Sequence, residues 1–187
     1  MARALSLGGH PLILLPVAAM VKLSLYDGEL LGISLVVAII AVTGLSIFAF
    51  SLWQVRKGRW ADTDASVPSE RRTLTAATLV FLIGGAASSW LFGGPVELIC
   101  GLLGGAILIV VAVAVARWLK LSLHTAFAVY AALLIWPLYV WALAAFALSI
   151  AISWSRLALT RHDLKDVVAG AVAGLAAGLS YIAAATI

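Results

Sequence analysis

The chain has 187 residues, 64% of them apolar and only 11% charged, with a formal net charge of +4. A soluble domain of this length needs a polar surface that this composition does not supply, so a soluble globular fold is excluded. The modest positive charge, with no separate basic domain, argues against nucleic acid as a partner. We therefore expect residues 1–187 to form a single integral-membrane domain.

Long apolar segments follow one another along the chain, with short connections between them. A helix of about 20 apolar residues crosses a hydrocarbon core of about 30 Å, so the long segments predict transmembrane helices. The first segment is expected to be a short membrane helix or a re-entrant one. The predicted fold class is therefore all-α, a polytopic bundle of six to seven transmembrane helices. In chain order the segments are 9–26, 30–53, 73–92, 96–117, 121–136, 138–154 and 163–186.

The basic residues are concentrated in three connections, 54–72, 117–120 and 155–166, which alternating helices place on one side of the membrane. Two interpretations of this clustering stay open. Positive loops mark the cytoplasmic side of a membrane protein, and several cations at one end of a bundle also suit an anion site. Ten of the twelve Lys and Arg residues lie there: Arg56, Lys57, Arg59, Arg71, Arg72, Arg117, Lys120, Arg156, Arg161 and Lys165.

The connection before the last segment carries residues suited to phosphate chemistry. His162 and Asp166 are four residues apart, so on a helix they share a face and can touch. A carboxylate beside an imidazole selects one tautomer and stabilises its charged form, which suits a nucleophile or a base. Asp163 is expected in the first turn of the helix, near its positive end. Upstream, Ser155 and Arg156 offer a hydroxyl and a guanidinium for phosphate oxygens.

This pattern of Ser-Arg, five residues, His, three residues and Asp, within 155–166, resembles the third signature motif of the type 2 phosphatidic acid phosphatase (PAP2) superfamily. The second signature of that family, Pro-Ser-Gly-His, is similar to region 120–124. There Ser122 and His124 are kept, and leucines stand in place of the proline and glycine. Together with Lys120, the region resembles the Lys-x-Ser-x-His form of small prokaryotic integral-membrane members.

The first signature of the family, Lys, six residues and Arg-Pro, is matched poorly in region 54–72. The residue seven positions after Lys57 is Asp64 rather than arginine, and Arg71 and Arg72 are followed by threonine. The acidic stretch that ends in these arginines still looks like the variant first motif of small members. Of the two, Arg72 is preferred for phosphate contact.

The resemblance implies a PAP2-like core and metal-independent hydrolysis of a phosphate ester in two steps, without a cofactor. His162 would attack phosphorus and form a phosphohistidine, while Asp166 stabilises the imidazolium. His124 would protonate the leaving oxygen and then activate water. The residues expected to contact phosphate are Arg156, Lys120, Ser122, Ser155, Arg72, Arg71 and Lys57.

Two features lie outside these motifs. Glycines at 170, 174 and 178 are spaced by four residues, so they share one face of the last helix and predict a small-residue seam against another helix. His10, near the N-terminus and outside any motif, is interpreted as an interfacial residue.

The resemblance implies an amphiphilic phosphate as substrate, with its tail beside the bundle among membrane lipids. Polyisoprenyl phosphates or diphosphates are favoured over phosphatidic acid and phosphatidylglycerophosphate. Two alternatives stay open: a non-catalytic lipid-phosphate binder or transporter-like scaffold, and a phosphotransferase with an acceptor other than water. Whether copies of the chain assemble into a homo-oligomer is also open. The expected location is a prokaryotic inner membrane. The basic loops favour a cytoplasmic site, whereas many lipid phosphatases of this type act on the outer face.

Overall fold

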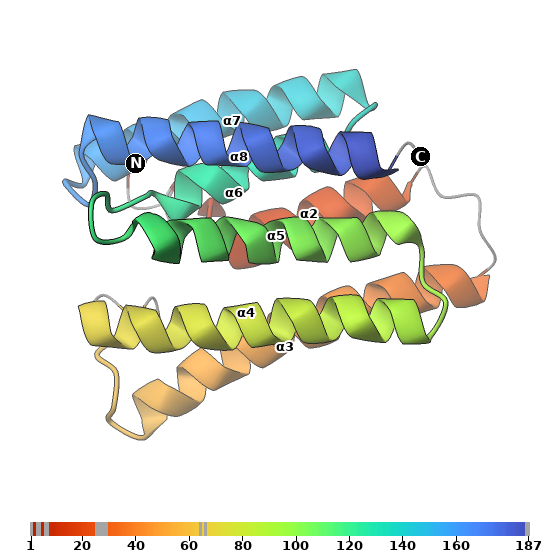
Figure 1. Ribbon diagram of the computed structural model, residues 1–187, viewed down its shortest axis with the longest axis horizontal. Helices are drawn as coiled ribbons and strands as arrows, with labels where there is room; N and C mark the ends of the chain where they lie inside the picture. Colours follow the sequence, from red (N-terminus) through yellow and green to blue (C-terminus); the bar gives the residue numbers. More distant parts are fainter. Residues whose placement is uncertain are drawn as a thin grey trace. The chain divides into compact units, whose positions relative to one another are not determined.

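The computed structural model describes residues 2, 5, 8–24, 30–63, 65 and 67–185. In these ranges the chain forms seven helices and no strand, which confirms the all-α prediction (Figure 1). The chain divides into two compact units, one made of residues 1–28 and 107–187 and the other of residues 29–106. The helices are α2 (Pro11–Leu23), α3 (Leu30–Arg56), α4 (Pro68–Leu91), α5 (Val96–Val115), α6 (Leu123–Leu134), α7 (Tyr139–Ala158) and α8 (Leu164–Ala185).

Five of the described helices, α3, α4, α5, α7 and α8, are long and apolar enough to cross a membrane. The other two are shorter, with 13 residues in α2 and 12 in α6. At about 1.5 Å per residue, α6 extends about 18 Å, well short of a hydrocarbon core of about 30 Å. Because five of the described helices can cross a membrane, the structure is that of an integral membrane protein. Each predicted segment corresponds to a helix.

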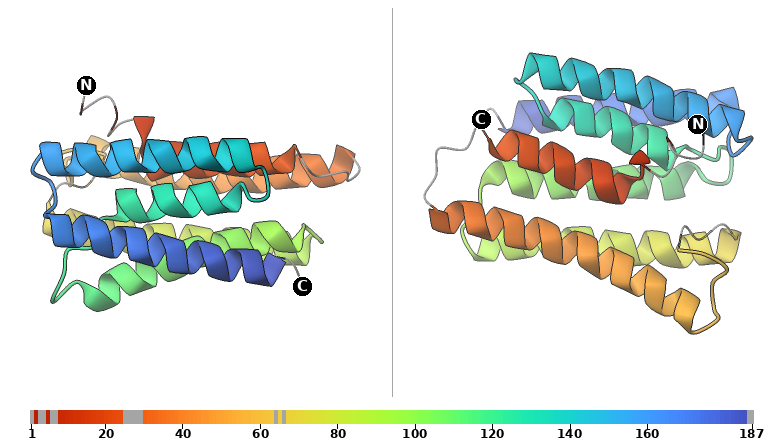
Figure 2. Two further views of the ribbon diagram at one scale, coloured as in Figure 1. Left: turned by 90° about the horizontal axis from the view of Figure 1, so that it is seen from above. Right: turned by 180° about the vertical axis from the view of Figure 1, so that it is seen from behind.

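Helix α6 is the buried centre of the first unit. Every residue of α6 from Thr125 to Leu134 is buried. The helix packs against α2, α7 and α8, and the left view of Figure 2 shows it between the longer α7 and α8. A helix that is apolar all round and enclosed in this way belongs to the protein core. Its ten buried residues therefore face protein rather than lipid.

The predicted glycine seam on α8 is confirmed, and its partner is α6. A Cβ atom added at Gly170 would lie 2.5 Å from the carbonyl oxygen of Ser122, and one added at Gly174 would overlap the carbonyl oxygen of Ala126. At Gly178 it would overlap a leucine side chain of α6. Because these contacts leave no room for a methyl group, the glycines let the two helices touch along their length.

Two helix boundaries differ from the prediction by four residues or more, and both differences concern the motifs. Helix α7 continues to Ala158, so Ser155 and Arg156 lie in its last turn rather than in a loop. Helix α4 begins at Pro68, so Arg71 and Arg72 are the fourth and fifth residues of the helix rather than part of the loop before it. Proline suits the first position of a helix because its fixed φ is helical and its missing N–H is not needed there.

Helix α7 ends in a Schellman motif that turns the chain toward α8. The N–H groups of Thr160 and Arg161 donate to the carbonyl oxygens of Leu157 and Arg156, at 2.9 and 3.1 Å. Thr160 adopts a φ of 50°. Glycine is the usual residue at this position, and α3 ends in the same motif with Gly58 at a φ of 67°. This turn carries the chain from the end of α7 to His162.

The seam predicts opposite effects for two glycine substitutions. Gly174→Ala places a methyl group against the backbone of α6, so α6 and α8 must separate, and we expect a loss of roughly 1–3 kcal/mol in stability. In the matched control, Gly84→Ala on α4, the added methyl group meets no atom within 4 Å. It should leave stability unchanged or raise it by about 1 kcal/mol or less through helix propensity. Thermal unfolding in detergent, followed by circular dichroism, measures both. Equal midpoints for the two variants would contradict the seam.

Candidate functional site

The connections before α6 and before α8 are joined by hydrogen bonds in the first unit. The Nζ of Lys120 donates to the carbonyl oxygen of Arg161 at 2.8 Å. The Nδ1 of His162 lies 3.1 Å from the carbonyl oxygen of Lys120, and the N–H of Ser122 donates to the carbonyl oxygen of Asp166 at 3.0 Å. The structure thus brings together the regions expected to form the second and third motifs.

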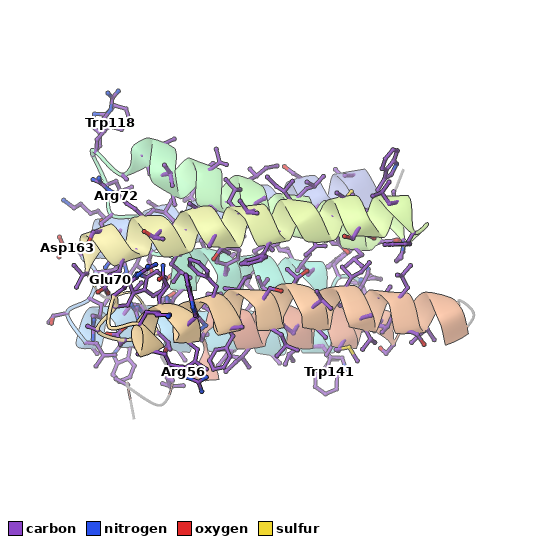
Figure 3. All side chains as sticks on the ribbon, turned by 90° about the horizontal axis from the view of Figure 1, so that it is seen from below. Arg56, Glu70, Arg72, Trp118, Trp141 and Asp163 are labelled. Atoms are coloured by element: carbon purple, nitrogen blue, oxygen red, sulfur yellow. The ribbon has the colours of Figure 1, made fainter. Side chains whose placement is uncertain are left out.

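Both connections lie at one end of the first unit. Figure 3 shows Trp118, which precedes α6, and Asp163, which precedes α8, at that end, and Trp141, from the start of α7, away from it. Trp118 is exposed, and the guanidinium of Arg117 lies 3.6 Å from the centre of its ring. The two loops are therefore placed where a group outside the helix bundle can reach them.

His162 is held in one tautomer by the backbone. A carbonyl oxygen can only accept a hydrogen bond, so Nδ1 of His162 donates to Lys120 and the neutral ring keeps its lone pair on Nε2. The Oδ2 atom of Asp166 lies 3.6 Å from Nδ1, within electrostatic range but beyond a hydrogen bond. His162 itself precedes α8 instead of lying within it, and the contact with Asp166 forms across the helix start.

Asp166 is a buried carboxylate at the first turn of α8, only 4% exposed. Its Oδ2 accepts the N–H of Asp163 at 3.2 Å, which satisfies a backbone donor at the helix start. Its Oδ1 is buried and has no hydrogen-bond partner among the described residues. Asp163 directly precedes α8, whereas the sequence predicted that it lies inside the first turn of this helix. A buried acceptor without a partner reduces stability, so the Oδ1 of Asp166 is a position where a donor would be favourable.

The pKa of His162 is lowered below its ordinary value of 6.5. Burial of the ring is the largest cause, and the positive charges of Arg156 and Lys120 act in the same direction. The hydrogen bond to the Lys120 carbonyl and the charge of Asp166 raise the pKa, but less. His162 lies outside the spanning helices, and at neutral pH its imidazole is neutral with a free lone pair, as a nucleophile requires.

The two serines predicted to contact phosphate are fully buried and bonded within the protein. Ser122 is the N-cap of α6, and its Oγ lies 3.1 Å from the Oγ1 of Thr125. The Oγ of Ser155 donates to the carbonyl oxygen of Ile152 at 2.6 Å. These hydroxyls hold the ends of α6 and α7 in place, so the charged groups are left as the surface available to an anion.

Arg156 and Lys120 supply positive charge near His162. Arg156 lies in the last turn of α7 and is partly exposed, and Lys120 is exposed. Both charges are close enough to lower the pKa of His162. One donor of the Lys120 ammonium is used by the Arg161 carbonyl, and an ammonium has three. The group can therefore hold the loop and contact an anion together.

His124 lies in the first turn of α6, two residues after the N-cap. Its ring meets the ring of His10 edge to face, with centroids 5.2 Å apart and an angle of 86° between the planes. Sequence reasoning left His10 outside the site. The only local signal was a histidine directly before a proline at a helix start, which does not reveal a partner far along the chain.

The residues of the first motif belong to the second unit. Lys57 follows α3, and Arg71 and Arg72 are exposed at the fourth and fifth residues of α4. The carboxylate of Glu70 accepts the N–H groups of Ala61 and Val67, at 3.1 and 3.5 Å, and so ties the connection to the helix start. Figure 3 shows Glu70 and Arg72 at the same end of this unit as Arg56. Lys57, Arg71 and Arg72 therefore all lie within the second unit.

No group of three or more His, Cys, Asp or Glu that could hold a metal ion occurs among the residues that the structure describes. Comparison with family models, with characterised proteins and with solved structures gave no match. The interpretation of the site therefore depends on the chemistry of its own residues.

The electrostatics of the site predict how the pKa of His162 responds to substitution. Arg156→Gln removes a charge that disfavours the imidazolium, so the pKa of His162 should rise toward 6.5. Asp166→Asn removes a charge that favours the imidazolium, so the pKa should fall further. Lys165→Gln, at an exposed lysine in the same unit, is the matched control and should change the pKa little.

NMR of ring-labelled histidine in detergent, as a function of pH, measures these values. A wild-type pKa of His162 at or above 6.5, or one that does not respond to Arg156→Gln, would contradict the assignment of charges.

Proposed function

We propose that the protein is a membrane-embedded, metal-independent lipid phosphate phosphatase that works through a phosphohistidine at His162. The observation that carries this proposal is the placement of His162. Its Nδ1 is bonded to a backbone carbonyl beside a buried aspartate, its pKa is lowered, and two cations lie near it. This combination leaves Nε2 as a neutral nucleophile next to positive charge that attracts a phosphate.

In the first step the lone pair of His162 Nε2 forms a bond to phosphorus while the bond from phosphorus to the ester oxygen breaks. His124 donates a proton to that oxygen, so the lipid alcohol leaves neutral. The phosphorylated ring is then positively charged. The Lys120 carbonyl, bonded to Nδ1, and the Asp166 carboxylate at 3.6 Å stabilise it.

In the second step His124, now neutral, takes a proton from a water molecule whose oxygen attacks phosphorus. The bond between phosphorus and Nε2 of His162 breaks, and inorganic phosphate and a neutral imidazole result. Arg156 and Lys120 offset the negative charge of the oxygens in both steps, and such donors are typically worth about 3 kcal/mol each in the transition state. In this proposal Ser122 and Ser155 hold the helix ends.

The substrate we propose is an amphiphilic phosphate. The loops lie at one end of a unit built from apolar helices, several of which expose large apolar side chains suited to contact with lipid. A phosphate attached to a long chain would place its head at the loops and its tail beside the helices. Polyisoprenyl phosphates or diphosphates are preferred, with phosphatidic acid and phosphatidylglycerophosphate as further candidates.

The proposal is tested by phosphate release from a panel of lipid phosphates, with purified protein in detergent and excess chelator. We expect release in the wild type, none above background for His162→Ala, and a reduction by about 10²-fold or more for Asp166→Asn and for His124→Ala. Asp163→Asn is the matched control for Asp166→Asn, because Asp163 is exposed and asparagine also caps helices, and it should retain activity.

Near-normal turnover by His162→Ala, or loss of wild-type activity with chelator, would refute the mechanism. Labelled phosphate that stays on the wild-type protein until an alcohol is added would instead support transfer to an acceptor other than water. Binding of lipid phosphate with no turnover in any of these assays would support a binder.

The concentration of basic residues in the loops predicts a cytoplasmic site in a prokaryotic inner membrane. In a Cys100→Ala background, Lys165→Cys places the single thiol at an exposed position of α8, beside the site. A membrane-impermeant maleimide should label this variant in inverted membrane vesicles and not in right-side-out vesicles. Labelling in right-side-out vesicles alone would place the site on the outer face.

A further inference from the structure

The chain just before α2 lies unusually close to α7. Gly9 is buried, and a Cβ atom added there would lie 2.5 Å from the Cγ1 of Ile152 and 2.8 Å from the carbonyl oxygen of Leu5. Ile152 itself is fully buried. Because only glycine fits between these atoms, Gly9 lets the N-terminal segment approach α7. This contact sets where the next residue, His10, is placed.

His10 is fixed in orientation by the start of α2. It is the N-cap of this helix, and its Nδ1 accepts the N–H of Leu12 at 3.2 Å. Pro11 occupies the first helical position, where its fixed φ favours the helix. Since Nδ1 accepts, the hydrogen of the neutral ring is on Nε2. The ring of His10 is therefore held by its own helix rather than being free to rotate.

The fixed ring of His10 meets His124. The two rings stand edge to face at 5.2 Å, and the helices that carry them, α2 and α6, pack together. The second torsion of a histidine side chain has a broad, shallow preference, so a ring at the start of a helix needs a neighbour to select one orientation. An edge-to-face aromatic contact provides such a selection.

We propose that His10 is a positioning residue that holds the ring of His124 in the orientation required for proton transfer to the leaving oxygen. This inference depends on the proposed function, in which His124 is the general acid. It assigns a role to the N-terminal segment, which lies outside every motif of the sequence. His10 acts through His124 and does not itself contact the substrate.

Two variants separate this role from helix capping. His10→Asn keeps an N-cap acceptor but loses the ring, whereas His10→Phe keeps an aromatic ring but loses the acceptor. With a lipid phosphate as substrate, we expect His10→Asn to lower kcat about tenfold with KM unchanged, less than the roughly 10²-fold that a displacement of about 1 Å costs. His10→Phe keeps the edge-to-face contact but loses the cap that fixes the ring, so it should retain a larger share of the wild-type kcat than His10→Asn does. The opposite order would assign His10 to capping and overturn the proposal.

The leaving group provides a second discrimination. A 4-nitrophenyl phosphate ester expels an oxygen that needs little protonation, so the rate of its first turnover should not change in His10→Asn. The same variant should slow the first turnover of an alkyl phosphate about tenfold. Equal slowing of both substrates would indicate a general structural defect and overturn the proposal. A fall in the thermal unfolding midpoint of His10→Asn large enough to explain its loss of kcat would overturn it as well.

A readout without turnover keeps this inference distinct from the proposed function. In NMR of ring-labelled histidine, His10→Asn should shift and broaden the ring signals of His124, and His10→Phe should leave them narrow. If the wild type releases no phosphate but these changes occur, the proposed function fails while the orienting contact is supported. Unchanged signals of His124 in His10→Asn would overturn the positioning role whatever the activity.

Discussion

The contact between α6 and α8 is the constraint on which the site depends. Gly170, in the second turn of α8, lies against the carbonyl oxygen of Ser122, the N-cap of α6, so the first two turns of α8 are level with the start of α6. This level allows the N–H of Ser122 to reach the carbonyl oxygen of Asp166, and the carbonyl oxygen of Lys120 to reach His162. A side chain at the seam would push α6 and α8 apart, and the two loops would separate with the helices. Close helix packing therefore sets the geometry of the candidate site.

The charges around His162 act on its pKa in opposite directions, which suits the change of charge that the proposed mechanism requires. Burial, Arg156 and Lys120 lower its pKa and keep the resting ring neutral. The carbonyl of Lys120 and the carboxylate of Asp166 act in the other direction and become favourable once the ring is cationic. In the proposed mechanism the same cations also attract phosphate, so one arrangement would prepare the nucleophile and offset the charge of the group that it attacks.

The proximity of His162 to Asp166 was predictable, because the spacing of the two residues is local. His162 and Asp166 are separated by four positions in the sequence. In the structure the Nδ1 of His162 lies 3.6 Å from the Oδ2 of Asp166, although His162 precedes the helix. The helix ends were predicted less well. The Schellman turn at Thr160 extends α7 past Ser155, and no glycine marks that turn in the sequence. The hydroxyls of the two serines were assigned to phosphate, whereas burial directs both to partners inside the protein.

The sequence by itself determined that the chain is a set of apolar helices, that a histidine and an aspartate share a helix start, and that glycines at 170, 174 and 178 line one face. Only the tertiary structure decided that those glycines pack against α6, that α6 is enclosed by α2, α7 and α8, and that the ring of His10 contacts the ring of His124. The physical reason is that side chains facing lipid and side chains facing the protein core are both apolar, so hydropathy carries no contrast between them. A contact between residues far apart along the chain leaves no periodic signal in either partner.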